Sequence, residues 1–556
     1  MKLTYRLKKI LKNRVFRKRN IGNSLEDINV YKDWIKKMDK TSIPRKTFNY
    51  SPKISILVPV YNVELQWLQK AVESVEKQTY KNWELCIVDD CSTNNDISKY
   101  LLAKQNDKIK VKILTKNSHI SVASNEALKL STGEFVALLD HDDELTENAL
   151  WEILLKLNED PDLDLIYSDE DKKLMSGERV YPAYKTNWNS ELLFSFMYVG
   201  HLGVYRKSII DEIGGFREGL EGAQDYDLIL RFTEKTNKIA HIPKVLYHWR
   251  MIPGSTAVEV NSKSYAYDRG RIALQQSLIR RGYDCIGVEE DELIRGNYHP
   301  VFKSVYSEVP VVIFLLASSD SERVVNEKIR KIKKKNSNVN KIFVVLSSTT
   351  IELGKEALSL IYKDNDYFEV MFRYLNELNE IKHFVFIKDT ISIQKIEWIE
   401  RLLVYSEREE VGCVSGKVIS SLGKIQYAGA HLQGNKKCYP NHNDDSDEIG
   451  YLGRVRRVQN TSFAYRDCFA LKSVLFKQYM KTKVNNYDFD GLNIELLLDE
   501  KKNIYYPYIE FVTSTPNNAE EQLQVQDKEL LEVMQRDRYL NPHLEIKEGN
   551  LQIKNI

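Results

Sequence analysis

Two clusters of acidic residues follow apolar, strand-like runs, and fifty residues separate them. Asp89 and Asp90 come directly after the run Glu84–Val88, and residues 140–143, with the sequence Asp-His-Asp-Asp, come directly after Phe135–Leu139. Carboxylates crowded at strand ends repel one another and destabilise a fold unless a cation lies between them. Mg²⁺ and Mn²⁺ prefer oxygen ligands, and ionised carboxylates also accept hydrogen bonds from hydroxyl and imide groups. The two clusters therefore predict a site for a divalent metal and a nucleotide.

The stretches around these clusters alternate between expected strands and helices. Strands are expected at Ile54–Val60, Glu84–Val88, Val111–Leu114, Glu134–Leu139 and Leu163–Tyr167, and helices at Leu68–Lys77, Ser121–Leu130 and Glu147–Asn158. Such alternation predicts a mostly parallel sheet covered by helices on both faces. Because ligands bind these sheets at the carboxyl ends of the strands, we interpret both acidic clusters as one site. Unrelated surface acids are the alternative.

A second cycle of the same kind begins near residue 309. Its expected elements are strands at Val309–Leu316, Lys341–Leu346 and Phe384–Ile387, with helices near Glu327–Lys335 and from about Ile396. A chain of 556 residues is too long for one compact core, so two or more domains are expected. We predict an α/β fold with two mostly parallel, Rossmann-related sheets in tandem, in domains 51–305 and 306–556. Residues 1–50 form an N-terminal segment and linker.

Composition argues against several classes of protein. The net charge is only +2, which gives no electrostatic field for binding nucleic acid. The six cysteines show no metal-type spacing and are interpreted as buried, reduced thiols of a cytoplasmic protein. No apolar run approaches the roughly 18 residues that a membrane span needs, and nothing resembles a cleavable secretion signal.

The amino terminus has a different character. Residues 1–19 contain nine Lys or Arg and no acid, with apolar residues at helical spacing. Such a basic amphipathic helix can lie on an anionic membrane surface, here the inner face of the cell membrane. A solvated helix or a disordered basic tail is the alternative.

Five segments between residues 53 and 260 resemble glycosyltransferase family 2 in their order and spacing. They are Pro59-Val60-Tyr61-Asn62, Val88-Asp89-Asp90-Cys91-Ser92, Asp140-His141-Asp142-Asp143, Gln224-Asp225-Tyr226-Asp227-Leu228 and His248-Trp249-Arg250. The resemblance is strongest to the bacterial enzymes that build O-antigen, capsule and other surface glycans. It implies an inverting, metal-dependent transferase of GT-A fold that uses a nucleotide sugar.

The resemblance assigns the first two segments to the nucleoside. Tyr61 stacks on a pyrimidine base, Asp89 accepts from the uracil or thymine imide, and Asp90 binds a ribose hydroxyl. Pro59 and Asn62 belong to the same nucleotide-binding set. The alternatives are a half-buried loop aromatic for Tyr61, and a turn or helix cap for the two acids.

The third segment is the metal motif of the family. By resemblance, Asp142 is the direct ligand of Mn²⁺ or Mg²⁺, Asp140 lies nearer the ribose and a metal-bound water, and His248 supplies a later ligand. A metal there neutralises the departing nucleoside diphosphate. For His248, a structural histidine is the alternative.

The fourth segment supplies the catalytic base. Asp225 matches the family residue that takes the proton from the acceptor hydroxyl, and an ordinary carboxyl is ionised at neutral pH. The alternative is that Asp225 only caps the following helix. His201, Gln224, Trp249 and Arg250 are weaker candidates for contacts to acceptor or phosphate; core packing is the alternative for Trp249, and solvent exposure for Arg250.

The second cycle departs from this pattern. Val345-Leu346-Ser347-Ser348 stands where the first has Val88-Asp89-Asp90, and Lys388-Asp389-Thr390 stands where it has the acidic cluster. A lysine beside the metal position opposes a cation. We interpret 306–556 as a degenerate, non-catalytic GT-A-like domain for acceptor binding, scaffolding or oligomerisation. Asp488 and Asp490 could echo the base, and Arg454, Arg456 and Arg457 could hold a phosphate, a glycan or the partner domain.

These inferences combine into one hypothesis about function. The chain transfers a sugar from a nucleotide-sugar donor, most simply UDP-linked, to a glycan, glycoprotein or lipid-linked acceptor in bacterial surface-glycan synthesis. The alternatives are a bifunctional transferase and a non-catalytic glycan-binding scaffold. A sugar nucleotidyltransferase is disfavoured because no glycine-rich phosphate loop follows Ile54–Val60. The sugar stays open among glucose, galactose, N-acetylhexosamines and rhamnose.

Overall fold

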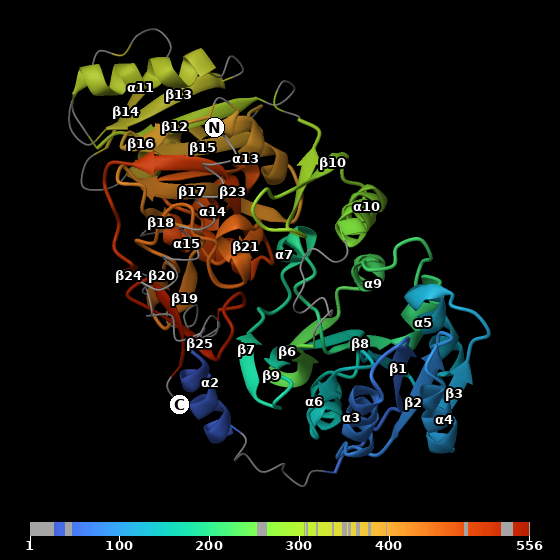
Figure 1. Cartoon of the computed structure of the whole chain (residues 1–556). Helices are drawn as coiled ribbons and strands as arrows, with labels where there is room; N and C mark the ends of the chain where they lie inside the picture. The colour runs from blue at the N-terminus through green and yellow to red at the C-terminus, as the bar shows by residue number, and fades with distance from the viewer. Residues whose placement is uncertain are drawn as a thin grey trace, which may run out of the picture.

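Two α/β units lie side by side in the chain (Figure 1). The computed structural model describes residues 27–38, 47–252, 264–304, 306, 310–318, 321–335, 339–346, 353, 357–362, 367–375, 378, 380–395, 397–482, 488–523 and 537–554. The basic helix predicted at residues 1–19 lies outside the described residues, as do Ser347 and Ser348.

The first unit is built on a nine-stranded sheet with the order β3-β2-β1-β4-β8-β6-β9-β5, and β7 pairs with β6. The strands are β1 (Ile54–Val60), β2 (Trp83–Asp89), β3 (Ile109–Ile113), β4 (Phe135–Leu138), β5 (Glu144–Leu145), β6 (Leu165–Lys173), β7 (Arg179–Ala183), β8 (Gly203–Arg206) and β9 (Ile239–Arg250). β1 is parallel to β2 and β4, and β6 is parallel to β9, while β8 runs antiparallel between β4 and β6. The strands predicted from the sequence are confirmed.

Helices cover both faces of this sheet. They are α3 (Leu65–Glu76), α4 (Asn95–Lys104), α5 (His119–Leu130), α6 (Ala149–Glu159), α7 (Ser190–Ser195), α8 (Lys207–Glu212), α9 (Gln224–Phe232) and α10 (Ser264–Arg280), followed by the hairpin β10 (Cys285–Glu290) and β11 (Tyr298–Phe302). Ile56 and Val58 of β1 pack in the core that contains α3 and α6, whereas Leu57 packs in the core that contains α5. Burial on both faces explains why β1 is an unbroken apolar run.

The second unit has a sheet with the same strand order, β14-β13-β12-β15-β22-β17-β23-β16, with β18 and β21 beside it. The strands are β12 (Val311–Leu316), β13 (Val339–Leu346), β14 (Ala357–Ile361), β15 (His383–Lys388), β16 (Ile391–Ile393), β17 (Val411–Ser420), β18 (Ile425–Tyr427), β21 (Gln459–Thr461), β22 (Cys468–Lys472) and β23 (Lys502–Thr513). β12 is parallel to β13 and β15, and β22 runs antiparallel between β15 and β17, as in the first sheet. The same order and directions support an internal repeat.

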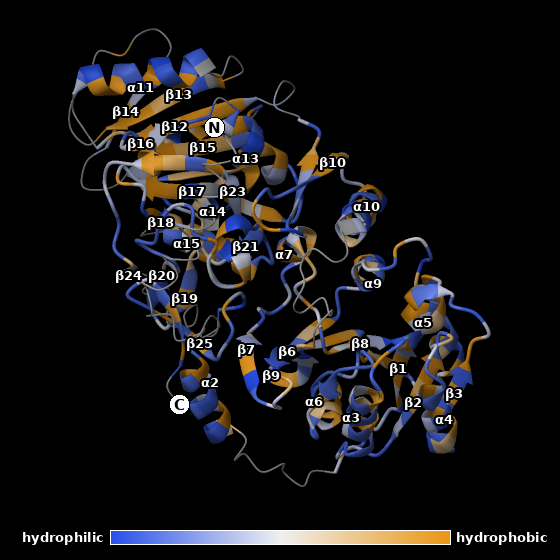
Figure 2. Ribbon diagram, in the orientation of Figure 1, coloured by the Kyte–Doolittle hydropathy of each residue, from blue (hydrophilic) through white to orange (hydrophobic). Residues whose placement is uncertain are grey.

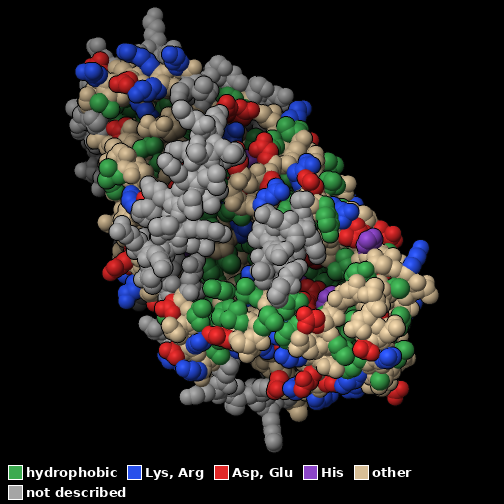
Figure 3. Space-filling view, viewed as in Figure 1, with side chains coloured by type: hydrophobic (Ala, Val, Ile, Leu, Met, Phe, Trp, Pro, Cys, Tyr) green, Lys and Arg blue, Asp and Glu red, His purple; other side chains and the backbone are tan. Residues whose placement is uncertain are grey.

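Helices and apolar strands also alternate in the second unit. Its helices are α11 (Glu322–Lys335), α12 (Tyr367–Leu375), α13 (Trp398–Ser406), α14 (Ser473–Thr482) and α15 (Phe489–Leu498). Figure 2 shows apolar strands β12, β13 and β15 beside the hydrophilic α11. Basic side chains gather on the surface over α11 in Figure 3, and Lys331 is 65% exposed, so this face of the helix is solvated.

Several elements lie outside the two repeated sheets. They are α2 (Ile28–Met38), a small sheet of β19 (His431–Gln433), β20 (Lys436–Cys438) and β24 (Glu520–Gln522), the 3-10 helix η3 (Tyr451–Arg456), and the hairpin β25 (Leu544–Lys547) and β26 (Asn550–Ile553). Tyr31 and Trp34 of α2 are buried in one apolar cluster with the hairpin residues Leu544 and Ile546. The sequence did not predict α2, which lies within the range assigned to an N-terminal segment and linker.

The two units meet through buried polar contacts. Arg408 donates two hydrogen bonds to the carboxylate of Glu191 on α7, at 2.8 and 2.5 Å. Asn189 and Asn460 exchange backbone-to-amide hydrogen bonds at 3.0 and 3.3 Å. These groups are buried, so neither unit exposes this surface to solvent.

The arginines near η3 contribute to the same interface. Arg456 forms an ion pair with Asp291 of the first unit at 2.9 Å, and Arg457 lies over the ring of Phe196. Arg454 instead donates to Gln459 within the second unit. Of the roles predicted for these arginines, Arg456 and Arg457 therefore make the contact with the partner domain.

The six cysteines are free, and five of them are buried, as predicted. Among the described residues, no helix is both long and apolar enough to cross a membrane.

Replacing Glu191 with Ala leaves the buried Arg408 guanidinium with Glu410 as its remaining carboxylate partner. Breaking a buried ion pair costs about 3–5 kcal/mol, so we expect a loss near the lower end, about 3 kcal/mol, in urea unfolding at neutral pH. The matched control is Glu73→Ala, which removes an exposed pair with Lys77 and costs less than about 1 kcal/mol. Equal losses in the two variants would contradict a buried docking contact.

Candidate active site

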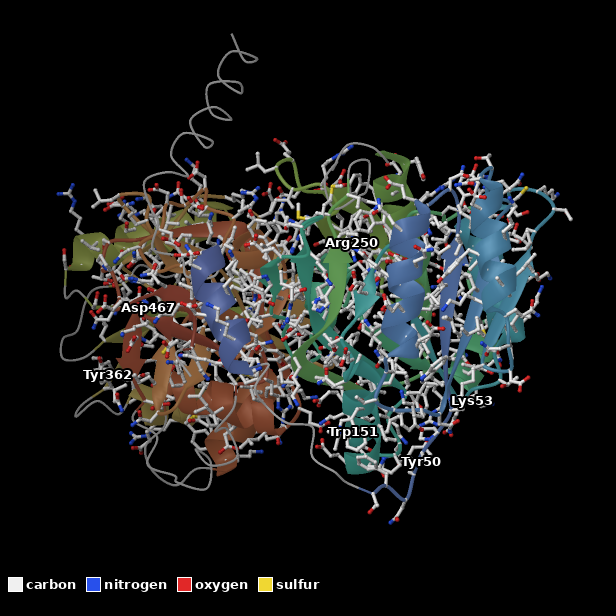
Figure 4. All side chains as sticks on the ribbon, turned by 60° about the horizontal axis from the view of Figure 1, so that its bottom comes forward. Tyr50, Lys53, Trp151, Arg250, Tyr362 and Asp467 are labelled. Carbon is white, nitrogen blue, oxygen red and sulfur yellow. The ribbon has the colours of Figure 1, made fainter. Side chains whose placement is uncertain are left out.

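The carboxyl ends of the parallel strands meet at one edge of the first sheet. In Figure 4, Lys53, which precedes β1, lies at one end of this sheet, and Arg250, the last residue of β9, lies toward the other. Because β1, β2, β4, β6 and β9 share one direction, their last residues converge at the edge that Arg250 marks. The acidic clusters of the first unit follow β2 and β4 at this edge.

The two acids after β2 are engaged in the local turn. Asp89 is fully buried and accepts hydrogen bonds from the backbone and hydroxyl of Ser92, at 3.1 and 2.5 Å, and from the hydroxyl of Ser98 at 3.1 Å. Asp90 accepts from the backbone N–H of Ser118 at 2.7 Å. These bonds are the turn and cap contacts that the sequence left as the alternative. Whether the two carboxylates also bind a nucleoside stays a prediction.

The loops after β1 and β2 are tied together around an exposed tyrosine. The side-chain oxygen of Asn62 accepts from the backbone N–H of Thr93 at 2.8 Å, and Nδ1 of His141 lies 3.1 Å from the carbonyl oxygen of Pro59. The Tyr61 side chain is 43% exposed at this rim. An exposed ring on a fixed loop can stack on a base.

The acidic cluster divides into a structural acid and two acids nearer solvent. Asp143 is fully buried, and it accepts from the hydroxyl of Tyr247 at 2.6 Å and from the backbone N–H of Arg250 at 2.7 Å. The Asp140 side chain is 46% exposed, and Asp142 is half-buried. Asp143 therefore fastens the loop to β9, while Asp140 and Asp142 remain for a ligand.

Arg250 braces the acidic loop from β9. Its side chain is 1% exposed, stacks on the ring of Trp67 at 4.5 Å, forms an ion pair with Glu144, and donates to the backbone carbonyl of Asp142 at 2.9 Å. The expected alternative for Arg250, a solvent-exposed side chain, is wrong because the guanidinium is enclosed between β5, β9 and α3.

The chemistry of Asp140 and Asp142 fits a divalent metal shared with phosphates. Burial, with the charge of Asp140, raises the pKa of Asp142, and a nearby cation would oppose this effect. In the described part of the chain, no three His, Cys, Asp or Glu side chains are spaced to hold a metal alone. Mg²⁺ commonly binds one or two carboxylates and completes its coordination with water and substrate phosphates.

The histidine beside these acids is His201. Its Nε2 lies 3.7 Å from a carboxylate oxygen of Asp140, and its ring stacks on Tyr247 with centroids 4.6 Å apart. The predicted ligand His248 instead has its Nδ1 2.6 Å from a carboxylate oxygen of Asp171. A carboxylate on Nδ1 is how proteins often orient a ligating imidazole, so the metal role of His248 stays a prediction.

Asp225 lies in the same electrostatic environment. Burial raises the pKa of Asp225, a charged His201 lowers it, and the negative charge of Asp140 raises it further. The N-cap residue of α9 is Ala223, so Asp225 is not the N-cap itself, but its carboxylate accepts from the first-turn backbone N–H of Tyr226 at 2.8 Å. The catalytic role of Asp225 stays a prediction. Gln224 uses its side-chain oxygen to accept from the backbone N–H of Gly222 at 2.6 Å, which holds the turn before α9.

Trp249 lies at the rim next to His201. Its ring centroid is 6.3 Å from that of His201, and Lys172 places its ammonium 5.2 Å from the Trp249 ring. The ring is half-buried and also packs against the core, so the geometry serves core packing, the alternative to an acceptor contact.

Three successive carboxylates of β6 connect the site to distant segments. Asp169 lies 2.8 Å from Nε2 of His241 and accepts from the amide of Asn541 at 2.9 Å. Asp171 accepts from the hydroxyl of Tyr31 at 2.6 Å, in addition to its contact with His248. Both acids are fully buried, and their partners come from α2 and from the last described segment of the second unit.

Glu170 holds the loop that carries His201. Its carboxylate accepts from the backbone N–H of His201 at 2.7 Å and from the ammonium of Lys185 at 3.0 Å. The buried Lys185 also donates to the carbonyl oxygens of Val199 and His201, at 2.6 and 2.5 Å. The partners of this Asp-Glu-Asp segment are remote in sequence, so a local pattern does not reveal them.

The corresponding edge of the second unit lacks the acidic loop. Residues 389–390 join β15 to β16, whereas residues 139–143 join β4 to β5. Asp389 accepts from the backbone and hydroxyl of Ser318, at 2.9 and 2.5 Å. Asp490 is the second residue of α15, as Asp225 is of α9, and it accepts from the ammonium of Lys437 at 2.7 Å.

Tyr31→Phe removes a hydroxyl that donates to the buried charge of Asp171. Because hydrogen bonds to charged groups contribute about 1.5–3 kcal/mol, we expect the free energy of unfolding to fall by about 2 kcal/mol in urea denaturation. The matched control is Tyr80→Phe, whose hydroxyl donates only to the backbone carbonyl of Pro52 and costs about 1 kcal/mol. A Tyr31 variant no less stable than the control would speak against this anchor.

Comparison with known proteins agrees with the motifs. A family model described as glycosyl transferase family 2 matches residues 55–214. The chain is 32% identical over 446 residues to the uncharacterized protein y4gI of Sinorhizobium fredii, covering 76% of this chain and 48% of that protein. It is 27% identical over 390 residues to the O-antigen biosynthesis protein RfbC of Myxococcus xanthus, covering 68% of this chain and 30% of that protein.

A third relative is covered over most of its length. The chain is 30% identical over 215 residues to the putative colanic acid biosynthesis glycosyl transferase WcaA of Escherichia coli, covering 34% of this chain and 73% of that protein. The chain spans less than half the length of y4gI and of RfbC. The ordered motifs lie at one sheet edge, the family model matches, and WcaA is covered over 73% of its length at 30% identity. The chain therefore belongs to glycosyltransferase family 2.

Proposed function

We propose that the chain is an inverting, divalent-metal-dependent glycosyltransferase of bacterial surface-polysaccharide synthesis. It moves a sugar from a nucleotide donor, most simply UDP-linked, to a glycan, glycoprotein or lipid-linked acceptor. The observation that carries the proposal is the convergence of Asp140, Asp142, His201 and Asp225 on one sheet edge with coupled charges. Relatives named for O-antigen and colanic acid biosynthesis support the polysaccharide context.

The donor lies across the carboxyl ends of β1, β2 and β4. The exposed Tyr61 ring stacks on the base, and Asp89 and Asp90 face the nucleoside. Asp140 and Asp142 would hold Mn²⁺ or Mg²⁺ with the diphosphate oxygens, and the bound ion neutralises charge on the departing nucleoside diphosphate. The fixed loop contacts of Asn62 and Asp143 keep these side chains in place without reorganisation.

Asp225 acts as the general base. It takes the proton of the acceptor hydroxyl as that oxygen attacks the anomeric carbon from the face opposite the diphosphate, so the configuration inverts. Burial alone would keep Asp225 protonated to higher pH, whereas the positive charge of His201 lowers its pKa. The positive charge of His201 therefore favours the ionised form of the base.

The two sheets agree best with two GT-A-like domains in tandem. The domain at 51–305 is catalytic and the domain at 306–556 is non-catalytic. The shortened loop at residues 389–390 and the Lys437 ammonium on Asp490 support loss of donor chemistry in the second. The competing function is a bifunctional transferase, and it is supported by Asp490, which occupies the position that corresponds to the base Asp225.

We further propose a cytoplasmic location at the inner membrane face through residues 1–19.

Substitutions of two aspartates, one in each domain, distinguish a single active domain from a bifunctional transferase. Asp142→Asn should abolish Mn²⁺-dependent hydrolysis of UDP-sugars and transfer from them, because it removes a charged metal ligand. Asp389→Asn, at the position after β15, should leave both unchanged. Donor turnover is followed as UDP release across a panel of nucleotide sugars, with and without Mn²⁺. Transfer that survives in Asp142→Asn would favour the bifunctional enzyme, and metal-independent turnover of the parent would contradict the metal role.

The charge of His201 should be visible in the pH profile of kcat/KM. Activity rises with pH as Asp225 ionises, so this acid limb reports its raised pKa. His201→Asn removes the charge that lowers the pKa of Asp225, and the limb should move to higher pH. His119→Asn is the control, because a residue at its φ of +68° tolerates Asn and Asp225 is not coupled to it. A limb unmoved by His201→Asn would contradict this electrostatic role.

A further inference from the structure

A cavity of about 780 Å³ lies among elements that the repeated sheets do not contain. Its walls come from the sheet β19-β20-β24, the turn at residues 442–443, the segment before β24 and the hairpin β25–β26. Figure 1 shows these strands grouped at one end of the second unit, beside α2. The chain between β18 and β22 covers residues 428–467, against residues 184–202 between β7 and β8, so this region is an elaboration of the second unit.

Most side chains around the cavity are polar, with three acids, Glu520, Glu545 and Glu548, against two bases, Lys436 and Lys547. Four amides, Gln433, Asn443, Asn517 and Asn518, lie among them, beside the imidazole of His442. The ammonium of Lys436 is paired with Glu520 at 2.8 Å, so the lining offers no concentrated positive charge for a phosphate. Amide groups both donate and accept hydrogen bonds, and sugar hydroxyls do the same. This donor and acceptor set suits a polyhydroxylated, uncharged ligand.

The walls are held in shape by their own hydrogen bonds. Gln433 accepts from the backbone N–H of Ile546 at 2.8 Å, and Nε2 of His442 donates to the carbonyl oxygen of Asn517 at 3.0 Å. Burial lowers the pKa of His442, so this ring is neutral at physiological pH. Gly549, at a φ of +82°, packs so closely on His442 that an added Cβ would lie 2.8 Å from its side chain. The hairpin is thereby fixed against the cavity.

One acceptor in this wall is buried without a partner. The Asn517 amide donates to the backbone carbonyl of Gln426 at 3.3 Å, which leaves its Oδ1 as the other polar atom of the group. Within the described residues, Oδ1 of Asn517 has no hydrogen-bond partner, and neither does Oε1 of the fully buried Gln426 nearby. Buried acceptors normally have a donor, and a rotation of the Asn517 amide toward the cavity that it lines would let a ligand hydroxyl supply one.

We propose that this cavity binds a neutral oligosaccharide, the part of the acceptor glycan that trails behind the growing end. Its volume lies in the range of cavities that enclose a small ligand, enough for a few sugar units. A glycan held here stays near the catalytic domain, which raises its effective concentration at Asp225. The inference rests on the proposed function, because only that function makes the bound glycan an acceptor. It also gives the second domain a role in binding that its degenerate sheet edge does not provide.

Binding is tested on the full chain without donor or metal. Neutral di- and trisaccharides of glucose, galactose, rhamnose and N-acetylhexosamines are screened by saturation-transfer NMR, and hits are titrated calorimetrically against UDP and inorganic phosphate. We expect at least one oligosaccharide to bind, and Asn517→Ala to weaken it about fivefold, as for one lost hydrogen bond. Asn518→Ala removes an exposed cavity side chain at no cost to folding and should weaken binding similarly.

The control is Asn435→Ala, on the exposed turn between β19 and β20, because Asn435 is not one of the residues that line the cavity. Binding unaffected by both cavity variants, no binding across the panel, or phosphate or UDP competing for the cavity would each overturn the inference. With a long acceptor, Asn518→Ala should raise KM and leave kcat unchanged. Because the binding assay needs no donor, a chain that binds oligosaccharide but fails to turn over nucleotide sugars refutes the proposed function alone.

Discussion

Three adjacent carboxylates in one buried strand set the conditions for the rest of the structure. Asp169 and Asp171 on β6 are fully buried and Glu170 between them is only slightly exposed, and buried charges are tolerated only with partners. Each carboxylate accepts a hydrogen bond from a segment that is remote in sequence: Asn541 for Asp169, the backbone of His201 for Glu170 and Tyr31 for Asp171. The loop of His201, the imidazole of His248 and the contact with Asn541 all follow from this requirement.

This arrangement makes the catalytic edge a property of the whole chain. The family model ends at residue 214, yet Tyr31 and Asn541, both outside it, complete the hydrogen bonds of Asp171 and Asp169. The two units are therefore joined at the carboxylate row as well as at the ion pair of Glu191 with Arg408. The second unit contributes hydrogen-bond partners to buried carboxylates of the first, which is a physical reason for the two to remain together.

The sequence predicted what depends on local pattern. Strands buried on both faces, such as β1, appear as unbroken apolar runs, and acids at the ends of β2 and β4 must share an edge once the strands are parallel. It missed what depends on partners far away: α2, whose Tyr31 pairs 140 residues onward, and the position of His201 beside Asp140. For Arg250 it predicted a contact to phosphate or acceptor, with solvent exposure as the alternative, since nothing local reveals that the guanidinium stacks on Trp67.

The second sheet repeats the strand order of the first without its acidic loop. The strand order needs only apolar runs of the right spacing, and these are retained from β12 to β23. The loop after β4 has five residues, 139–143, three of them acidic, whereas the loop after β15 has only residues 389–390. The corresponding aspartates also differ in their surroundings: the charge of His201 acts on Asp225, whereas Asp490 accepts a hydrogen bond from the ammonium of Lys437. Loops and charged side chains can therefore differ between the two units while the apolar core that fixes the strand order stays the same.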